Sequence, residues 1–114
     1  DITKEFMNNF EAVVLLSPEL QPNDRISCLK SIEKIVNEKS GKIISSEDWG
    51  LRDLSYKIDE HSKAFYNFYQ IEIKGDKIES IKKMLNQDEN FIRHLFVRVE
   101  KHQELPTKLN NEKK

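Results

Sequence analysis

The chain has 114 residues, a formal net charge of −1 and 34% charged residues. This length suits one domain, and so small a net charge excludes binding to polyanions through bulk charge alone. No apolar run approaches the roughly 20 residues of a membrane-spanning helix. A single cysteine excludes an internal disulfide and a cysteine-based zinc site. We therefore expect one small domain with a densely charged surface, in a reducing compartment.

The first predicted element is a strand at residues 10–16, where an almost wholly apolar run ends before Pro18. A run of this kind suits a central strand that is covered on both faces. Residues 1–8 are polar and show no period, so we expect a flexible arm there.

A helix is predicted at residues 22–39, because apolar residues recur there at helical spacing and predict one buried face. These residues are Ile26, Leu29, Ile32 and Val36, with Cys28 and Ile35 beside them. Asn23 or Asp24 is expected to cap the start of the helix, and Gly41 suits the position just past its end.

Residues 41–73 are predicted to form one long β-hairpin. Its first arm is expected to run from Lys42 to Ile58 and to be interrupted at Gly50, since glycine within a strand often marks a bulge. A polar turn is expected at residues 59–63.

The second arm of the hairpin is predicted at residues 64–73, with alternating faces. The face that carries Ile71 and Ile73 is expected to be core. The opposite face is expected to expose two aromatic residues, Tyr66 and Phe68.

A second helix is predicted after Lys74, with Asp76 as its cap in a capping-box-like pattern with a glutamate three residues later. Its apolar stripe consists of Ile78, Ile81 and Leu85, with Met84 beside it. A loop at 86–90 and a strand at 91–99 are expected to follow.

The predicted order β-α-β-β-α-β is typical of the α+β class with a ferredoxin-like split β-α-β fold, in which a four-stranded antiparallel sheet carries two helices on one face. We expect a flexible N-terminal arm at 1–8, the folded domain at 9–100 and a polar, disordered tail at 101–114.

Few residues suggest catalytic or metal chemistry. The three histidines, His61, His94 and His102, lack the spacing of metal ligands, and Cys28 lies on the predicted core stripe. Glu47 and Asp48 are adjacent on a strand, so they point to opposite faces and make a poor acid–base pair. We expect no catalytic site, no metal and no cofactor.

Aromatic and basic residues gather around the predicted hairpin turn and the last strand: Tyr56, Lys57, His61, Lys63, Tyr66, Phe68, Arg93 and Arg98. A sheet face with rings beside cations suits single-stranded or irregular RNA, because bases stack on rings and cations hold phosphates. The alternative is a solvated face with ordinary cross-strand pairs. Trp49 suits either packing near the hairpin bend or contact with a partner protein.

The run from Glu47 to Ile58, Glu-Asp-Trp-Gly-Leu-Arg-Asp-Leu-Ser-Tyr-Lys-Ile, resembles the most typical segment of the bacterial small-subunit ribosomal protein six family. The likeness continues at Phe10-Glu11-Ala12-Val13-Val14, Lys63-Ala64-Phe65-Tyr66, Asn90-Phe91-Ile92-Arg93 and Val97-Arg98. It covers residues 7–102 and includes every predicted element in order.

The resemblance implies a structural, non-catalytic protein of the small ribosomal subunit with the ferredoxin-like fold. Members of that family bind the central domain of small-subunit ribosomal RNA together with small-subunit ribosomal protein eighteen. The implied location is a bacterial ribosome in the cytoplasm, or alternatively a mitochondrial or other organellar one. The expected RNA-binding residues are Lys57, His61, Lys63, Tyr66, Arg93 and Arg98, and those expected at the protein interface are Trp49, Leu51 and Tyr56.

Two other classes share the predicted fold. Small phosphatases of this architecture hold phosphate in the loop after the first strand, but residues 17–24 carry two acids and neither arginine nor glycine there. A ligand-sensing or interaction module that pairs its sheets into dimers, without binding RNA, is the alternative that fold alone leaves open.

Overall fold

The computed structural model describes residues 7–101 and confirms the predicted element order. The elements are β1 Met7–Leu16, α2 Pro22–Glu38, β2 Lys42–Ile58, β3 His61–Lys74, the 3-10 turn η1 Gly75–Lys77, α3 Ile78–Gln87 and β4 Phe91–Val99. Because β1 already includes residues 7 and 8, the expected N-terminal arm overlaps a strand. Residues 1–6 and 102–114, which include most of the expected tail, lie outside the described part.

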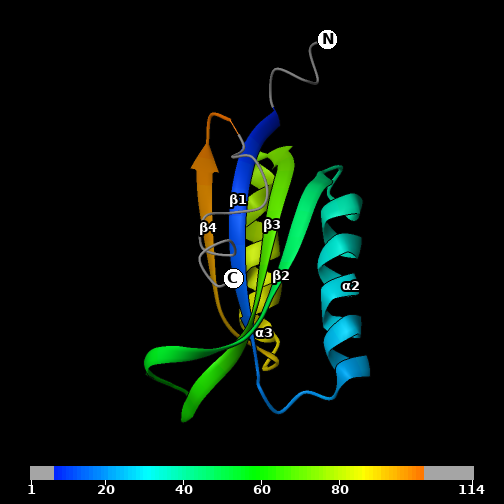
Figure 1. Ribbon diagram of the computed structural model, residues 1–114. Helices are drawn as coiled ribbons and strands as arrows, with labels where there is room; N and C mark the ends of the chain where they lie inside the picture. The colour runs from blue at the N-terminus through cyan, green and yellow to red at the C-terminus, as the bar shows by residue number, and fades with distance from the viewer. Residues whose placement is uncertain (1–6, 102–114) are drawn as a thin grey trace.

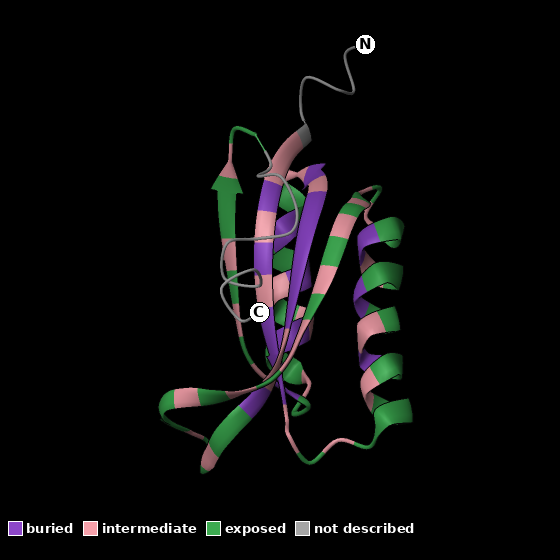
Figure 2. Ribbon diagram, in the orientation of Figure 1, coloured by how far each residue is buried: buried purple, intermediate pink, exposed green. Residues whose placement is uncertain are grey.

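The four strands form one antiparallel sheet in the order β2-β3-β1-β4, and both helices lie on one face of it (Figure 1). This is the predicted ferredoxin-like arrangement. The two central strands carry most of the buried residues, whereas β2, β4 and the outer sides of the helices are largely exposed (Figure 2).

Residues that pair across the sheet fall into rows that share a face. On the helix face the rows are Ile43–Ile71–Phe10–Arg98, Ser46–Tyr69–Ala12–Phe96 and Asp48–Asn67–Val14–His94. On the other face, here called the open face, the rows are Ser45–Gln70–Glu11–Val97, Glu47–Phe68–Val13–Leu95 and Gly50–Tyr66–Leu15–Arg93. The prediction that helices or other layers cover β1 on both faces is therefore wrong, because Val13 is only half-buried on the open face.

The core lies between the helix face and the two helices. Residues of α3 predicted to be buried, Ile78, Ile81 and Leu85, are all in it. On α2 the buried row is Cys28, Ile32 and Val36, whereas Ile26 keeps 48% of its exposure. The predicted stripe of α2 is thus wrong at Ile26, which lies about 120° around the helix from Ile32.

Neither helix begins with the predicted side-chain cap. Pro22 occupies the first position of α2, which leaves Asn23 and Asp24 inside the first turn, and the preceding residue makes no side-chain cap bond. Asp76 lies within η1 rather than at the start of α3, where Lys77 is the cap residue and makes no side-chain bond. Neither first turn therefore has a side-chain cap, and α2 instead begins with a proline, which suits the first helical position.

The predicted hairpin is present, but its turn is shorter than expected. Asp59 and Glu60 both have positive φ, 49° and 69°, and β3 begins at His61. Two residues in this conformation make the tight turn that matches the twist of antiparallel strands. The prediction of a five-residue turn at 59–63 is wrong because neither turn residue is glycine or asparagine, so the usual signal is missing.

Gly50 has φ 77° and lies at a register shift between β2 and β3, which confirms the predicted bulge. Its amide donates to Asp48 Oδ1 at 2.8 Å. The bulge determines which face of the sheet each later residue of β2 lies on, and so it positions the β2 residues of the site described next.

Candidate nucleic-acid interface

The β2–β3 hairpin extends past the body of the sheet and curls toward the β4 side (Figure 1). We call this region the hairpin end. It consists of residues 51–64 of the β2–β3 hairpin, which extend beyond β1, together with the start of β4 at residues 91–93. Five of the six expected RNA-binding residues lie in or beside it: Lys57, His61, Lys63, Tyr66 and Arg93. The structure therefore brings together residues that are up to 36 positions apart in the chain.

Arg93 links the two strands farthest apart in the sheet. Its Nη1 donates to the hydroxyl of Tyr56 at 3.2 Å, although Arg93 belongs to β4 and Tyr56 to β2. Tyr56 keeps 64% of its exposure, so its ring remains available to a partner. The bond places a residue expected at a protein interface directly against one expected to bind RNA.

A polar groove lies beside this contact, with a volume of about 580 Å³. His61 and Arg93 line it together with acidic residues of the hairpin turn and of the segment before β4, among them Asp59 and Asp88. Three carboxylates, Asp59, Asp88 and Glu89, and one arginine, Arg93, line it, so its interior is more negative than positive. Phosphates are therefore expected to approach the rim through Arg93, and the interior suits neutral hydrogen-bonding groups such as base edges.

The two lysines of the hairpin end differ in their surroundings. Lys63 pairs with Asp53 at 3.6 Å, with both side chains largely exposed, so this pair is screened by water and contributes little. Lys57 is exposed, and no ion pair of this residue occurs among the described residues. Lys57 is therefore the readier of the two to meet a phosphate.

The expected exposed aromatics on β3 are in fact covered. Trp49 stacks on Phe68 with ring centroids 5.4 Å apart and on Tyr66 at 6.4 Å. Phe68 retains only 4% exposure, and Tyr66 is half-buried. The prediction of exposure is wrong for Phe68, because the indole covers it on the open face, whereas Tyr66 is only partly covered.

Local hydrogen bonds hold Trp49 in this position. Its Nε1 donates to Glu47 Oε1 at 2.8 Å, and its carbonyl oxygen accepts from Arg52 Nε at 3.0 Å. The Arg52 guanidinium also lies 5.6 Å from the indole centroid. Packing therefore explains Trp49, while the neighbouring Leu51, 47% exposed, remains free to contact a partner.

Arg98 lies apart from the others. It is near the far end of β4, in a helix-face row, and its Nη2 donates to Asn8 Oδ1. Arg93 belongs to an open-face row near the start of the same strand. One flat RNA surface therefore cannot contact both arginines; an RNA that reaches both must pass around the β4 edge.

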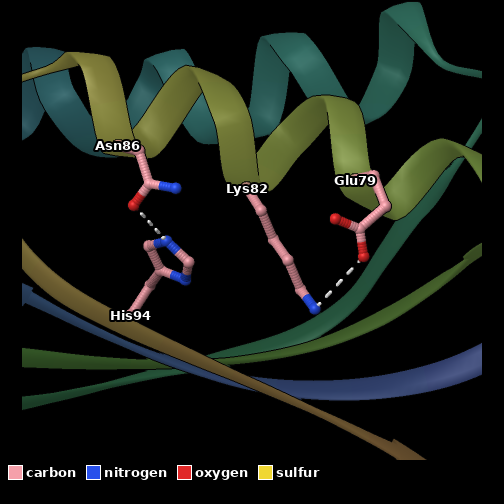
Figure 3. Close-up of polar contacts among 4 residues, drawn as sticks. All are labelled: Glu79, Lys82, Asn86 and His94. Atoms are coloured by element: carbon pink, nitrogen blue, oxygen red, sulfur yellow. Dashed lines mark hydrogen bonds and ion pairs between the residues drawn. The ribbon is translucent and has the colours of Figure 1, made fainter.

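His94 also lines this groove, although the sequence did not single it out as a site residue. Its ring faces α3, where its Nε2 lies 3.0 Å from Asn86 Oδ1 (Figure 3). The ring also makes an edge contact with Phe96. On the same helix Lys82 pairs with Glu79 at 3.6 Å (Figure 3). Burial, and then the charge of Lys82, hold the pKa of His94 below its ordinary value.

We expect the stability of the protein to fall on mild acidification because of His94. A lowered folded-state pKa means that the unfolded chain binds the proton first, so this contribution is present above about pH 6.5 and is lost as the pH falls below it. Urea unfolding at about pH 7.5 and about pH 5.5 should show this loss, and His94→Gln should show less of it. Lys82→Gln should raise the pKa of His94, and Lys83→Gln is the matched control. An equal loss in His94→Gln would assign the effect to other groups.

The structure offers little for other chemistry. The described residues contain no group of three or more histidine, cysteine or acidic side chains that could hold a metal ion. Among residues 7–101, no helix has the length and hydropathy needed to cross a membrane. Burial, and the nearby Asp88 carboxylate, raise the pKa of the Cys28 thiol, so its reactive thiolate form is disfavoured.

The sequence matches known proteins over nearly all of this fold. The family described as Ribosomal protein S6 matches residues 9–98. The small ribosomal subunit protein bS6 of Christiangramia forsetii is 33% identical over 96 residues, which cover 84% of this chain and 86% of that protein. The protein of the same name from Maricaulis maris is 33% identical over 104 residues, which cover 91% of this chain and 89% of that protein.

Two solved structures have a similar fold. The crystal structure of 30S ribosomal protein S6 from Thermotoga maritima has a TM-score of 0.78 at 20% identity, covering 82% of this chain and 88% of that one. The solution structure of the C-terminal domain of the MgtC protein from Mycobacterium tuberculosis has a TM-score of 0.60 at 11% identity, covering 87% and 95%. The fold therefore occurs in proteins of different names, so family assignment depends on the sequence match.

Proposed function

The chain belongs to the ribosomal protein S6 family, and on that premise we propose that it binds the central domain of small-subunit ribosomal RNA together with small-subunit ribosomal protein eighteen. Members of the family are structural, non-enzymatic proteins of the small ribosomal subunit, associated with ribosomal RNA. The relatives named above are bacterial. The ligand-sensing alternative rests on fold alone, and no specific feature of the site favours it.

The observation that carries the RNA contact is the cluster at the hairpin end. Arg93, Lys57 and His61 present donors there beside the half-buried ring of Tyr66. Phosphates would be held by the cations, and an unpaired base would find ring edges and polar groups in the groove. Lys63 and Arg98 would add outer phosphate contacts, Lys63 at the hairpin and Arg98 around the β4 edge.

The protein partner would meet the exposed apolar side chains of the hairpin. Leu51 and Tyr56 are 47% and 64% exposed, and exposed large apolar groups on a projecting arm are typical of contact sites. Trp49 would support this surface from below through its stack on Phe68. Since Tyr56 holds Arg93, the partner and the RNA would meet at one point of the molecule.

Arg93→Ala is expected to weaken binding of the partner-loaded protein to a central-domain RNA fragment about tenfold at low salt, because one charge-assisted contact is lost. The slope of log K against log salt should fall by about 1. Filter binding over a salt series measures both quantities.

Lys34→Ala is the matched control for this experiment, because Lys34 is exposed on α2, away from the hairpin end. It should leave affinity and slope unchanged. Arg98→Ala tests whether the RNA passes around the β4 edge. If Arg93→Ala binds with the wild-type slope, the hairpin end is not the phosphate contact.

A further inference from the structure

A second groove lies on the helix face, between α2 and the neighbouring strands β2 and β3, with a volume of about 310 Å³. It is separate from the hairpin end described above. Ile26 and Leu29 form its wall on α2, and Asp48 and Asn67 form its floor from one row of the sheet. Ile26 keeps 48% of its exposure, so the groove has an apolar, open wall facing a polar floor.

Asn67 is the unusual residue of this floor. The residue retains only 6% exposure, and its Oδ1, which is closed to solvent, has no hydrogen-bond partner among the described residues. Its neighbours in the row and along β3 include Val14 and Tyr69, which are core residues. An apolar side chain would avoid the cost of a buried acceptor without a donor, so an asparagine here calls for a donor from outside the chain.

The electrostatic potential of the groove indicates which donor would fit. Glu33 lines it from α2 and Asp48 from β2. Desolvation first, and then these two carboxylates, raise the pKa of the Tyr69 hydroxyl, so their negative charge is felt inside the groove. Lys30 is the one basic residue of the lining. Asp48 uses Oδ1 for the Gly50 amide, which leaves its other oxygen for a ligand.

We propose that this groove binds an arginine side chain of a basic protein partner. The methylene stem would lie against Ile26 and Leu29, and the guanidinium would donate to the carboxylate of Asp48. It would also donate to Asn67 Oδ1 once the asparagine side chain turns toward the groove, because this oxygen is closed to solvent in the unbound protein. Arginine fits better than lysine because its planar fork directs several donors at once toward an amide and a carboxylate. RNA phosphates would be repelled by Glu33 and Asp48, so this surface serves a protein and not the nucleic acid.

The inference can be tested on the isolated full chain, so its outcome does not depend on the RNA contact proposed above. An NMR titration with Nα-acetylarginine methylamide is expected to shift the Asn67 side-chain amide and the backbone amides of Asp48 and Glu33 in a saturable way. The matched probe Nα-acetylcitrulline methylamide has the same shape without the charge and should produce no such shifts. Equal shifts with both probes, or shifts confined to other residues, would overturn the proposal.

Variants locate the contact further. Asp48→Asn keeps an acceptor for the Gly50 amide but removes the charge. Asp48→Asn and Glu33→Gln should each weaken arginine binding about two- to fivefold, because each removes one negative charge. Glu38→Gln is the control, because Glu38 is an exposed acid of α2 outside the groove. Asn67→Leu should abolish binding of the arginine probe without lowering the unfolding midpoint. Unchanged affinity in the Asp48 and Asn67 variants would also contradict the proposal.

Discussion

Replacing Trp49 with alanine is expected to lower the free energy of unfolding by about 2–4 kcal/mol. The indole covers Phe68, which is 4% exposed, and stacks on it with an interplanar angle of 9°. Removing the indole exposes the rings of Phe68 and Tyr66 to solvent, and Glu47 loses the hydrogen bond that the indole donates. Because Trp49 is the only tryptophan, unfolding should be followed by circular dichroism rather than by fluorescence.

Two further variants separate packing from partner contact. Trp49→Phe keeps a ring over Phe68 and loses the hydrogen bond to Glu47, so it should cost only about 1 kcal/mol. Tyr56→Ala removes a ring that is 64% exposed and should change stability by less than about 0.5 kcal/mol. If Trp49→Ala proved as mild as Tyr56→Ala, the indole would be a contact for a partner and not a structural cover.

Gly41→Ala is expected to destabilise the protein by about 1–3 kcal/mol through overpacking. A Cβ at this position would lie 2.8–2.9 Å from three side-chain atoms of Ile73, well inside normal contact distance. Ile73 is fully buried and surrounded by core residues, so it cannot move aside. Chemical denaturation of the variant measures the loss.

A double-mutant cycle identifies the cause. Ile73→Ala removes two of the three clashing atoms, so combining it with Gly41→Ala should cost less than the sum of the single variants, by about 0.5–3 kcal/mol. Gly75→Ala is the control, because its Cβ would meet only the end of the flexible Asn8 side chain, at 3.1 Å. Strict additivity at 41 and 73 would rule out the clash.

The sequence predicted the α3 stripe of Ile78, Ile81 and Leu85 from its strong periodicity, and these residues are buried as expected. β4 was expected at residues 91–99 and occurs there, although its two faces do not separate by polarity. Details set by backbone conformation were missed. The turn at Asp59 and Glu60 adopts positive φ without glycine, so a pattern of residue types could not reveal it.

The candidate site was less predictable for a related reason. The alternation of faces along β2 is broken at Gly50, and beyond a bulge the count of odd and even positions no longer gives the face. The cover that Trp49 forms over Phe68 therefore could not be read from the sequence. Similarly, the bond between Arg93 and Tyr56 depends on how the hairpin curls toward β4, a long-range property.

The central place of β1 in the sheet has a consequence for synthesis. β1 is the first strand of the described chain to be translated, yet it pairs with β3, where residue 7 faces residue 74, and with β4, which follows every other element. The apolar residues of β1 stay unpaired until β3 and β4 have been synthesised, so the nascent chain cannot complete its sheet until residue 99 has left the exit tunnel. Folding is then expected to have a high contact order and to finish only after β4 has emerged, and β1 is the segment that a chaperone would protect until then.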